Sequence, residues 1–159
     1  MEELKRALDL RMRSDHQASN KLLKELARQY PEAAIIQYQC ACSHDLLGLE
    51  TEAVPYYEKA LSLGLESGEA QGAYIGLGSS YRISGEYEKS KAILEEGLKK
   101  FPENRAIQVF YSMVLYNLGH YGESIKNLLK IVADTSMDPD IQEYQRAIDL
   151  YHDKLEPIR

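Results

Sequence analysis

The side chains of this sequence that could carry out chemistry are few and scattered. Two cysteines, Cys40 and Cys42, lie two positions apart in a helical pattern, so their side chains diverge by about 200° and cannot form a disulfide within the helix. They do not have the spacing of a zinc-ligand pair. The four histidines are spread along the chain, at His16, His44, His120 and His152. We therefore expect neither a disulfide framework nor a metal site, and we expect each histidine to lie on the surface or at a helix end.

The sequence also lacks the motifs that usually carry catalysis, such as a nucleophile elbow, a zinc-protease helix or a phosphate loop. The stretch Gly76–Ser80 is only weakly similar to a glycine-rich phosphate loop, and within a helical pattern its glycines are better explained by close packing. His44 and Asp45 are adjacent, so on a helix they point in different directions and cannot form a dyad. We predict a protein that is not an enzyme and that has no catalytic residues and no cofactor.

Composition narrows the class of partner. The chain has 159 residues, with 19 basic and 25 acidic side chains and a net charge of -6, which argues against a surface that neutralises nucleic-acid phosphates. It contains no run of 18 apolar residues, the minimum for a membrane helix, and its N-terminus alternates charged residues with leucine. We expect a cytoplasmic protein that binds neither nucleic acid nor membranes.

A helical repeat supplies the framework. The stretch from Ala73 to Asn104 contains two short helical patterns, which are joined at Ser84 and Gly85 and followed by Pro102. Its large, small, aromatic and helix-breaking residues are Tyr74, Leu77, Gly78, Tyr81, Gly85, Tyr87, Leu94, Gly97 and Pro102. With these residues at these spacings the stretch resembles the 34-residue tetratricopeptide repeat. A helix pair of this size cannot bury its apolar face alone, so the resemblance implies stacked neighbours.

The same pattern recurs along the chain. The turn glycines Gly85 and Gly119 are 34 residues apart, whereas Gly48 precedes Gly85 by 37 residues, with the three additional residues at Gly68–Ala70. The predicted units are residues 1–33, 34–70, 71–104 and 105–138. In every unit the two positions where the helices cross hold small residues, namely Ala7 with Ser19, Ala41 with Ala53, Gly78 with Ser90, and Ser112 with Ser124. Small residues at a crossing allow two helices to approach closely.

The expected fold is all-α, a right-handed α-solenoid of four tetratricopeptide-like helix pairs and a C-terminal capping helix, in a single domain of residues 1–159. The predicted helices span residues 2–13, 15–29, 32–47, 50–63, 69–83, 86–100, 104–118, 120–133 and 139–155. Asp15 and Asp138 are expected N-caps. The last helix carries an apolar stripe of Ile141, Tyr144, Ile148, Tyr151 and Leu155. It caps the fourth unit, or alternatively its stripe occupies the groove or pairs with a second chain.

The resemblance also implies where a partner binds, because in this family the first helix of each pair lines a concave groove. The corresponding positions are Tyr38, Cys42, Asp45, Ile75, Ser79, Arg82, Val109, Met113 and Tyr116. Most are apolar or aromatic, which suits an amphipathic helix or an extended apolar segment. Family members that clamp a terminal carboxylate use lysines where this chain has Leu4, Tyr38, Ile75 and Val109, so we do not expect such a clamp.

The function predicted from these observations is that of a non-catalytic scaffold or adaptor, which binds a peptide or protein segment in the concave groove. Two alternatives remain open at this point. One is self-assembly into a homo-oligomer through the apolar groove or the C-terminal helix, and the other is a sensor of a small ligand or peptide. A narrower resemblance, to small bacterial proteins of tetratricopeptide repeat group 5, rests on chain length and repeat layout.

Overall fold

The computed structural model describes residues 1–157, and within these residues the chain forms ten helices and no strand. The helices are α1 Glu2–Met12, α2 His16–Gln29, α3 Ala34–Asp45, α4 Glu50–Leu63, α5 Ser67–Ile83, α6 Tyr87–Lys100, α7 Arg105–Asn117, α8 Tyr121–Thr135, α9 Pro139–Glu143 and α10 Gln145–Tyr151. The first eight match predicted helices to within two residues at either end. They form four consecutive pairs, which confirms the α-solenoid.

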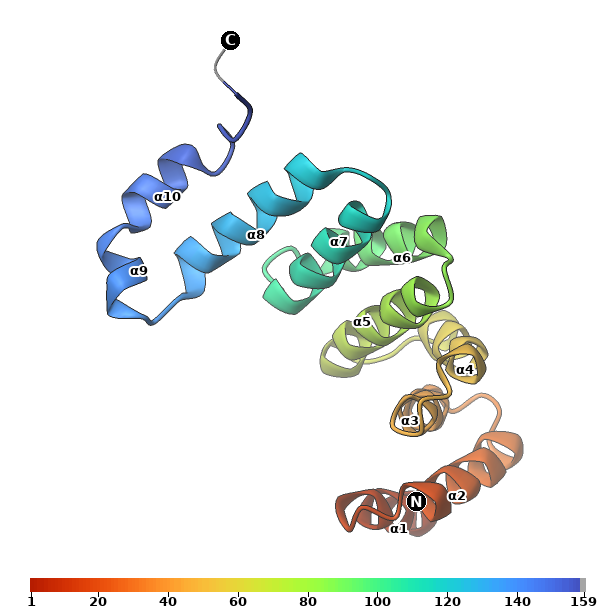
Figure 1. The fold of residues 1–159 in the computed structure, drawn as a ribbon. Coiled ribbons are helices and arrows are strands. Elements are labelled where there is room, and N and C mark those ends of the chain that lie inside the picture. The colour runs from red at the N-terminus through yellow and green to blue at the C-terminus, as the bar shows by residue number, and fades with distance from the viewer. Residues whose placement is uncertain (158–159) are drawn as a thin grey trace.

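The helices follow one another along an arc, with the N-terminus at one end and the C-terminus at the other (Figure 1). Each helix from α1 to α7 packs against the next, α8 packs against α10, and α5 also contacts α3 and α7. Helices α3, α5 and α7 lie on the inner side of the arc relative to α4 and α6 (Figure 1). The first helices of successive pairs therefore form a continuous inner layer.

The small residues at the predicted helix crossings are all buried. In three of the pairs a serine on the second helix donates a hydrogen bond to a backbone carbonyl of the first: Ser19 to Ala7 at 2.8 Å, Ser90 to Gly78 at 2.6 Å, and Ser124 to Ser112 at 2.6 Å. A serine at this place fills the narrow gap and satisfies its hydroxyl at the same time. The structure thus confirms the crossings and adds a hydrogen bond that their residue size did not predict.

The turn inside each pair depends on one residue with a left-handed backbone. Gly85 and Gly119 have φ values of 77° and 83°, and each donates its amide hydrogen to a carbonyl in the last turn of the preceding helix. In the first pair Ser14 takes this conformation, with φ of 64°. Asp15 then caps α2 by accepting a hydrogen bond from the Ala18 amide, as predicted.

The core consists of apolar clusters that form where neighbouring helix pairs meet. One cluster joins the first pair to α3 through Leu4, Leu23, Leu26 and Ile36. A second is centred on Tyr57 and Leu77, and a third on Tyr74, Leu94 and Ile107. Each pair is therefore stabilised by its neighbours, as expected of a stacked repeat.

The C-terminal helix differs from its prediction. A single helix was expected over residues 139–155, but the chain forms two short helices separated at Tyr144, and Leu155 lies outside both. Neither glycine nor proline marks this break. Contacts with α8 set the direction of α10, since Gln145 donates a hydrogen bond to the Ala133 carbonyl and Asp149 pairs with Lys130 at 2.9 Å. The break is thus a tertiary effect that helix periodicity could not reveal.

Candidate binding surface

The nine residues expected to bind a partner lie in three sets on the first helices of the second, third and fourth pairs. We call them the inner-face residues. Tyr38, Cys42 and Asp45 are on α3, Ile75, Ser79 and Arg82 are on α5, and Val109, Met113 and Tyr116 are on α7. Only Met113 and Tyr116 are exposed, with 38% and 57% of their surface accessible, whereas the other seven are half-buried. Accessibility on this face therefore increases toward the C-terminus.

The α3 set is partly occupied by contacts within the protein. The Tyr57 hydroxyl donates a hydrogen bond to Asp45 Oδ2 at 2.5 Å and lies 3.7 Å from Cys42 Sγ, while Ser80 donates to Asp45 Oδ1 at 3.4 Å. Burial raises the pKa of Asp45, although the hydrogen bonds from Tyr57 and Ser80 act in the opposite direction. The Tyr38 ring packs beside Gly72 of α5, with its centroid 6.2 Å from that of Tyr57.

The α5 set connects neighbouring helices. The Arg82 Nε donates a hydrogen bond to Asn117 Oδ1 at 2.8 Å, which joins the end of α5 to the end of α7. Ile75 packs against the cluster of Tyr74, Leu94 and Ile107. These two side chains thus contribute to stacking of the repeats as well as to the inner face.

The α7 set begins an apolar surface that continues onto α8. Tyr116 meets Tyr121 edge to face, with ring centroids 4.9 Å apart. On α8, Ile125 and Val132 are 42% and 40% exposed and lie about two helical turns apart on the same side. Sequence reasoning missed these α8 residues because it assigned the inner face to first helices alone.

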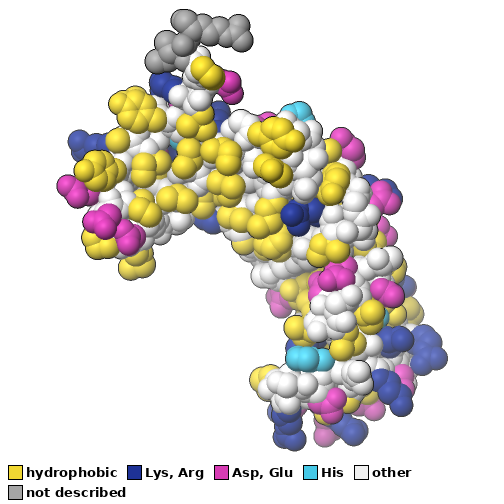
Figure 2. All heavy atoms as spheres, in the orientation of Figure 1, with side chains coloured by type: hydrophobic (Ala, Val, Ile, Leu, Met, Phe, Trp, Pro, Cys, Tyr) yellow, Lys and Arg dark blue, Asp and Glu magenta, His cyan; other side chains and the backbone are white. Residues whose placement is uncertain are grey.

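The direction of this α8 side follows from its neighbours. Ser124 points to α7, because its hydroxyl bonds the Ser112 carbonyl, and Lys130 points to α10, because it pairs with Asp149. On the helical wheel Ile125 and Val132 lie about 80–100° from Ser124 and about 140–160° from Lys130, so they face neither of these two partners. Figure 2 shows hydrophobic side chains gathered over the part of the molecule that holds α8 and α10, whereas charged side chains are interspersed toward the N-terminal end.

A comparison of the third and fourth repeats could have revealed this surface. Four polar residues of the third repeat have apolar counterparts 34 positions later: Ser79 and Met113, Arg82 and Tyr116, Lys91 and Ile125, Glu95 and Leu129. In the third repeat Lys91 and Glu95 form an ion pair of 2.7 Å, and Tyr111 donates to Glu95 at 3.0 Å. The fourth repeat has lost these polar contacts, and an apolar surface takes their place.

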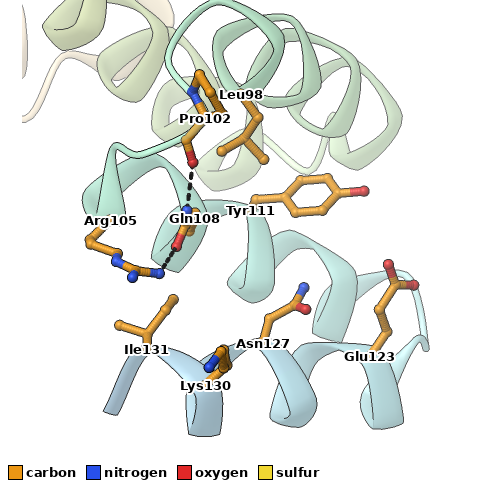
Figure 3. Close-up of a pocket in the computed structure, with 9 residues that line it drawn as sticks. All are labelled: Leu98, Pro102, Arg105, Gln108, Tyr111, Glu123, Asn127, Lys130 and Ile131. Atoms are coloured by element: carbon orange, nitrogen blue, oxygen red, sulfur yellow. Dashed lines mark hydrogen bonds between the residues drawn. The ribbon is translucent and has the colours of Figure 1, made fainter. Parts of the chain in front are cut away.

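A separate cleft, lined by both polar and apolar side chains, lies between α6, α7 and α8 (Figure 3). It has a volume of about 470 Å³ and is lined by Leu98, Pro102, Arg105, Gln108, Tyr111, Glu123, Asn127, Lys130 and Ile131. On the helical wheel of α7, Gln108 and Tyr111 lie about 80–160° from Val109, Met113 and Tyr116. Arg105 and Lys130 both pair with Asp134, at 3.0 Å and 3.1 Å, and Gln108 donates to the Pro102 carbonyl. Arg105, Gln108 and Lys130 are thus already engaged with neighbouring groups.

The buried thiol and imidazole of α3 form a structural cluster. Cys40 is fully buried, and burial raises the pKa of its thiol to about 12, so it is protonated at neutral pH. His44 lies in the last turn of α3, as expected, but it is buried rather than on the surface. Its Nδ1 is 2.8 Å from the Cys40 carbonyl oxygen, and its ring stacks on Tyr56. Among the described residues no group of three or more His, Cys, Asp or Glu could hold a metal ion.

Comparison with known proteins agrees with this architecture. The family described as "Tetratrico peptide repeat" matches residues 34–155, so the chain belongs to the tetratricopeptide repeat family. No curated protein sequence matches it significantly. In residues 1–157 no helix is both long and apolar enough to cross a membrane.

Two solved structures share the fold. The "MamA RS-1 ArsTM double mutant" superposes with a TM-score of 0.74 at 16% identity, covering 97% of this chain and 87% of that one. YrrB, described as "a TPR protein with an unusual peptide-binding site", superposes with a TM-score of 0.71 at 17% identity, covering 97% of this chain and 78% of that one.

Proposed function

We propose that this protein is a non-catalytic scaffold that binds an apolar or amphipathic segment of another protein on its inner face. The observation that carries the proposal is the exposed apolar surface of the fourth repeat, where Met113 and Tyr116 stand in place of Ser79 and Arg82. Exposed aromatic and methionine side chains are costly to leave in water but suit a partner that buries them. The peptide-binding site named for YrrB, which shares this fold, supports the same kind of function.

Within this proposal the three sets of inner-face residues have different roles. Met113, Tyr116 and the half-buried Val109 provide the apolar contacts, with Tyr121 of α8 enlarging the surface. The α3 and α5 sets form a part of the face whose side chains are held by contacts within the protein, since Asp45 is already hydrogen-bonded to Tyr57 and Ser80. A partner would then gain most of its binding free energy at the C-terminal half of the face.

A cytoplasmic location forms part of the proposal. Cys40 and Cys42 are free thiols, as is usual for proteins in a reducing compartment.

The test is selection of peptides from a displayed random library on the parent protein, followed by titration of one selected peptide. The double variant Met113→Glu with Tyr116→Glu should lower affinity for that peptide by about 100-fold, since two carboxylates would be desolvated on binding. The matched control is Ile83→Glu, at a side chain that is 58% exposed at the end of α5. Circular dichroism should show unchanged helicity in both variants, because exposed positions tolerate charge.

A selected peptide that binds the double variant as tightly as the parent would move the site away from this surface. Selection that yields no binder at all would count against a peptide-binding function.

A further inference from the structure

Helix α8 is the second helix of the fourth and last pair. The helix that packs against its outer side is much shorter than the helices that pack against α4 and α6. The helix following α4 is α5, with 17 residues, and the helix following α6 is α7, with 13 residues. In contrast, α8 is covered by α10, which has seven residues and ends at Tyr151. The side of α8 that a following repeat would cover is therefore only partly covered by α10.

The uncovered surface is apolar. We define the α8–α10 face by Ile125, Val132, Tyr144, Ile148 and Tyr151. Ile148 is half-buried, Ile125 and Val132 are 42% and 40% exposed, and Tyr144 and Tyr151 are 61% and 59% exposed. This face shares no residue with Val109, Met113 and Tyr116, to which the proposed peptide contacts are assigned, although it adjoins them on α8 through Tyr121.

The five residues lie on one side of the contact between α8 and α10. Asp149 turns toward Lys130, on the side of α8 away from Ile125. Tyr144, Ile148 and Tyr151 recur at steps of four and three residues, and on the helical wheel they lie about 100–160° from Asp149. Figure 2 shows hydrophobic side chains gathered over the part of the molecule that holds α8 and α10.

The two ends of the solenoid do not match each other. The α1 end presents Glu2, Glu3, Lys5, Arg6 and Asp9, which line a shallow polar hollow. Stacking this end onto the apolar C-terminal end would desolvate several charges without partners. Head-to-tail association into an open filament is therefore disfavoured, whereas two C-terminal ends are chemically alike and can cover each other.

The size of the face is sufficient for a small symmetric interface. A tyrosine that is about 60% exposed contributes roughly 100–150 Å². Together with Ile125, Val132 and Ile148, the two tyrosines give the face on the order of 500 Å² of accessible surface per copy. A pair of faces would bury about 1,000 Å², which is near the lower limit for a specific interface. The segments that carry the face also bear exposed charges of both signs, at Lys126, Glu143 and Arg146, so two identical copies need not repel each other.

We propose that two copies of this protein associate through their α8–α10 faces about a two-fold axis. The contact supplies each α8 with the cover that a following repeat would provide. It leaves Met113 and Tyr116 available to the partner segment, so dimerisation and peptide binding are separable.

The experiment is sedimentation velocity of the full chain over a wide range of concentrations. The parent mass should rise from 18.1 kDa toward twice that value and stop there. The double variant Tyr144→Glu with Tyr151→Glu should raise the dissociation constant of the dimer by about 100-fold or more, because two carboxylates per copy would be buried against apolar side chains. Tyr30→Glu is the matched control, at a 53% exposed tyrosine after α2, and should dimerise like the parent.

Several results would overturn the proposal. A parent that stays monomeric at every concentration would exclude a second copy as the occupant, and if Tyr144→Glu with Tyr151→Glu then abolished binding of a library-selected peptide, the face would belong to a partner protein. A dimer unaffected by the double variant would place the contact elsewhere. Masses that continue to rise beyond the dimer would indicate open stacking. Met113→Glu with Tyr116→Glu should keep the dimer while losing the peptide, so failure of one proposal leaves the other testable.

Discussion

Substitution of Gly78 tests the helix crossing on which the repeat architecture depends. A Cβ atom added at Gly78 would lie 2.6 Å from both Cγ and Cδ2 of Leu94, well inside van der Waals contact. Leu94 is only 1% exposed and belongs to the cluster with Tyr74 and Ile107, so it has little room to move. The opposing Ser90 hydroxyl already bonds the Gly78 carbonyl at 2.6 Å, which leaves no gap on that side either.

Gly78→Leu adds four carbon atoms at this crossing. Overpacking costs about 1–3 kcal/mol, and a branched side chain at the closest point of two helices should reach at least the upper value. For a protein of this length about 3 kcal/mol corresponds to a decrease in melting temperature of roughly 6–12 °C. Thermal unfolding followed by circular dichroism at 222 nm, a standard helix signal, measures this shift.

Gly68→Ala is the matched control, because Gly68 lies in the same helix and an added Cβ would meet nothing within 4 Å. It should leave the melting temperature unchanged or raise it slightly, since alanine is the better helix former. A Gly78→Leu variant that melts with the parent would show that the helices do not cross at this residue, and the assignment of the repeats would have to be abandoned.

Three further measurements test other parts of the structure. Ser90→Ala removes a buried hydroxyl that bonds the opposing carbonyl, so it should lower stability by about 1 kcal/mol, whereas the exposed Ser62→Ala should have no effect in the same melting assay. Because burial raises the pKa of Asp45, the folded chain binds this proton more tightly than the unfolded chain, and the contribution of Asp45 to stability should increase as pH falls through the raised pKa toward 3.8. Asp45→Asn lacks this gain, so the melting temperature of the parent relative to the variant should rise at acidic pH. A difference in melting temperature that stays constant with pH would contradict a raised pKa at Asp45. Removal of residues 139–159 uncovers the side of α8 near Ala133, so the shortened chain should melt at a lower temperature and scatter more light on heating, and equal stability would show that α9 and α10 do not cap the solenoid.

The sequence by itself determined the repeats. The turn glycines spaced 34 residues apart and the paired small residues, such as Gly78 with Ser90, predicted the helix pairs because helix ends and helix crossings depend on residues within one repeat. The eight helices from α1 to α8 follow from these local requirements. Even the serine hydrogen bonds belong to this level, since each joins two residues that are 12 positions apart.

Only the tertiary structure decided which parts of the inner face remain accessible. The nine inner-face residues are still a prediction as a binding site, but the structure separates the bonded Asp45 from the exposed Tyr116 because their surroundings come from other helices. The break at Tyr144 has the same origin, since α10 is oriented by contacts with α8. Exposure and helix direction here depend on residues brought together by stacking, and the periodicity of a single helix carries no information about them.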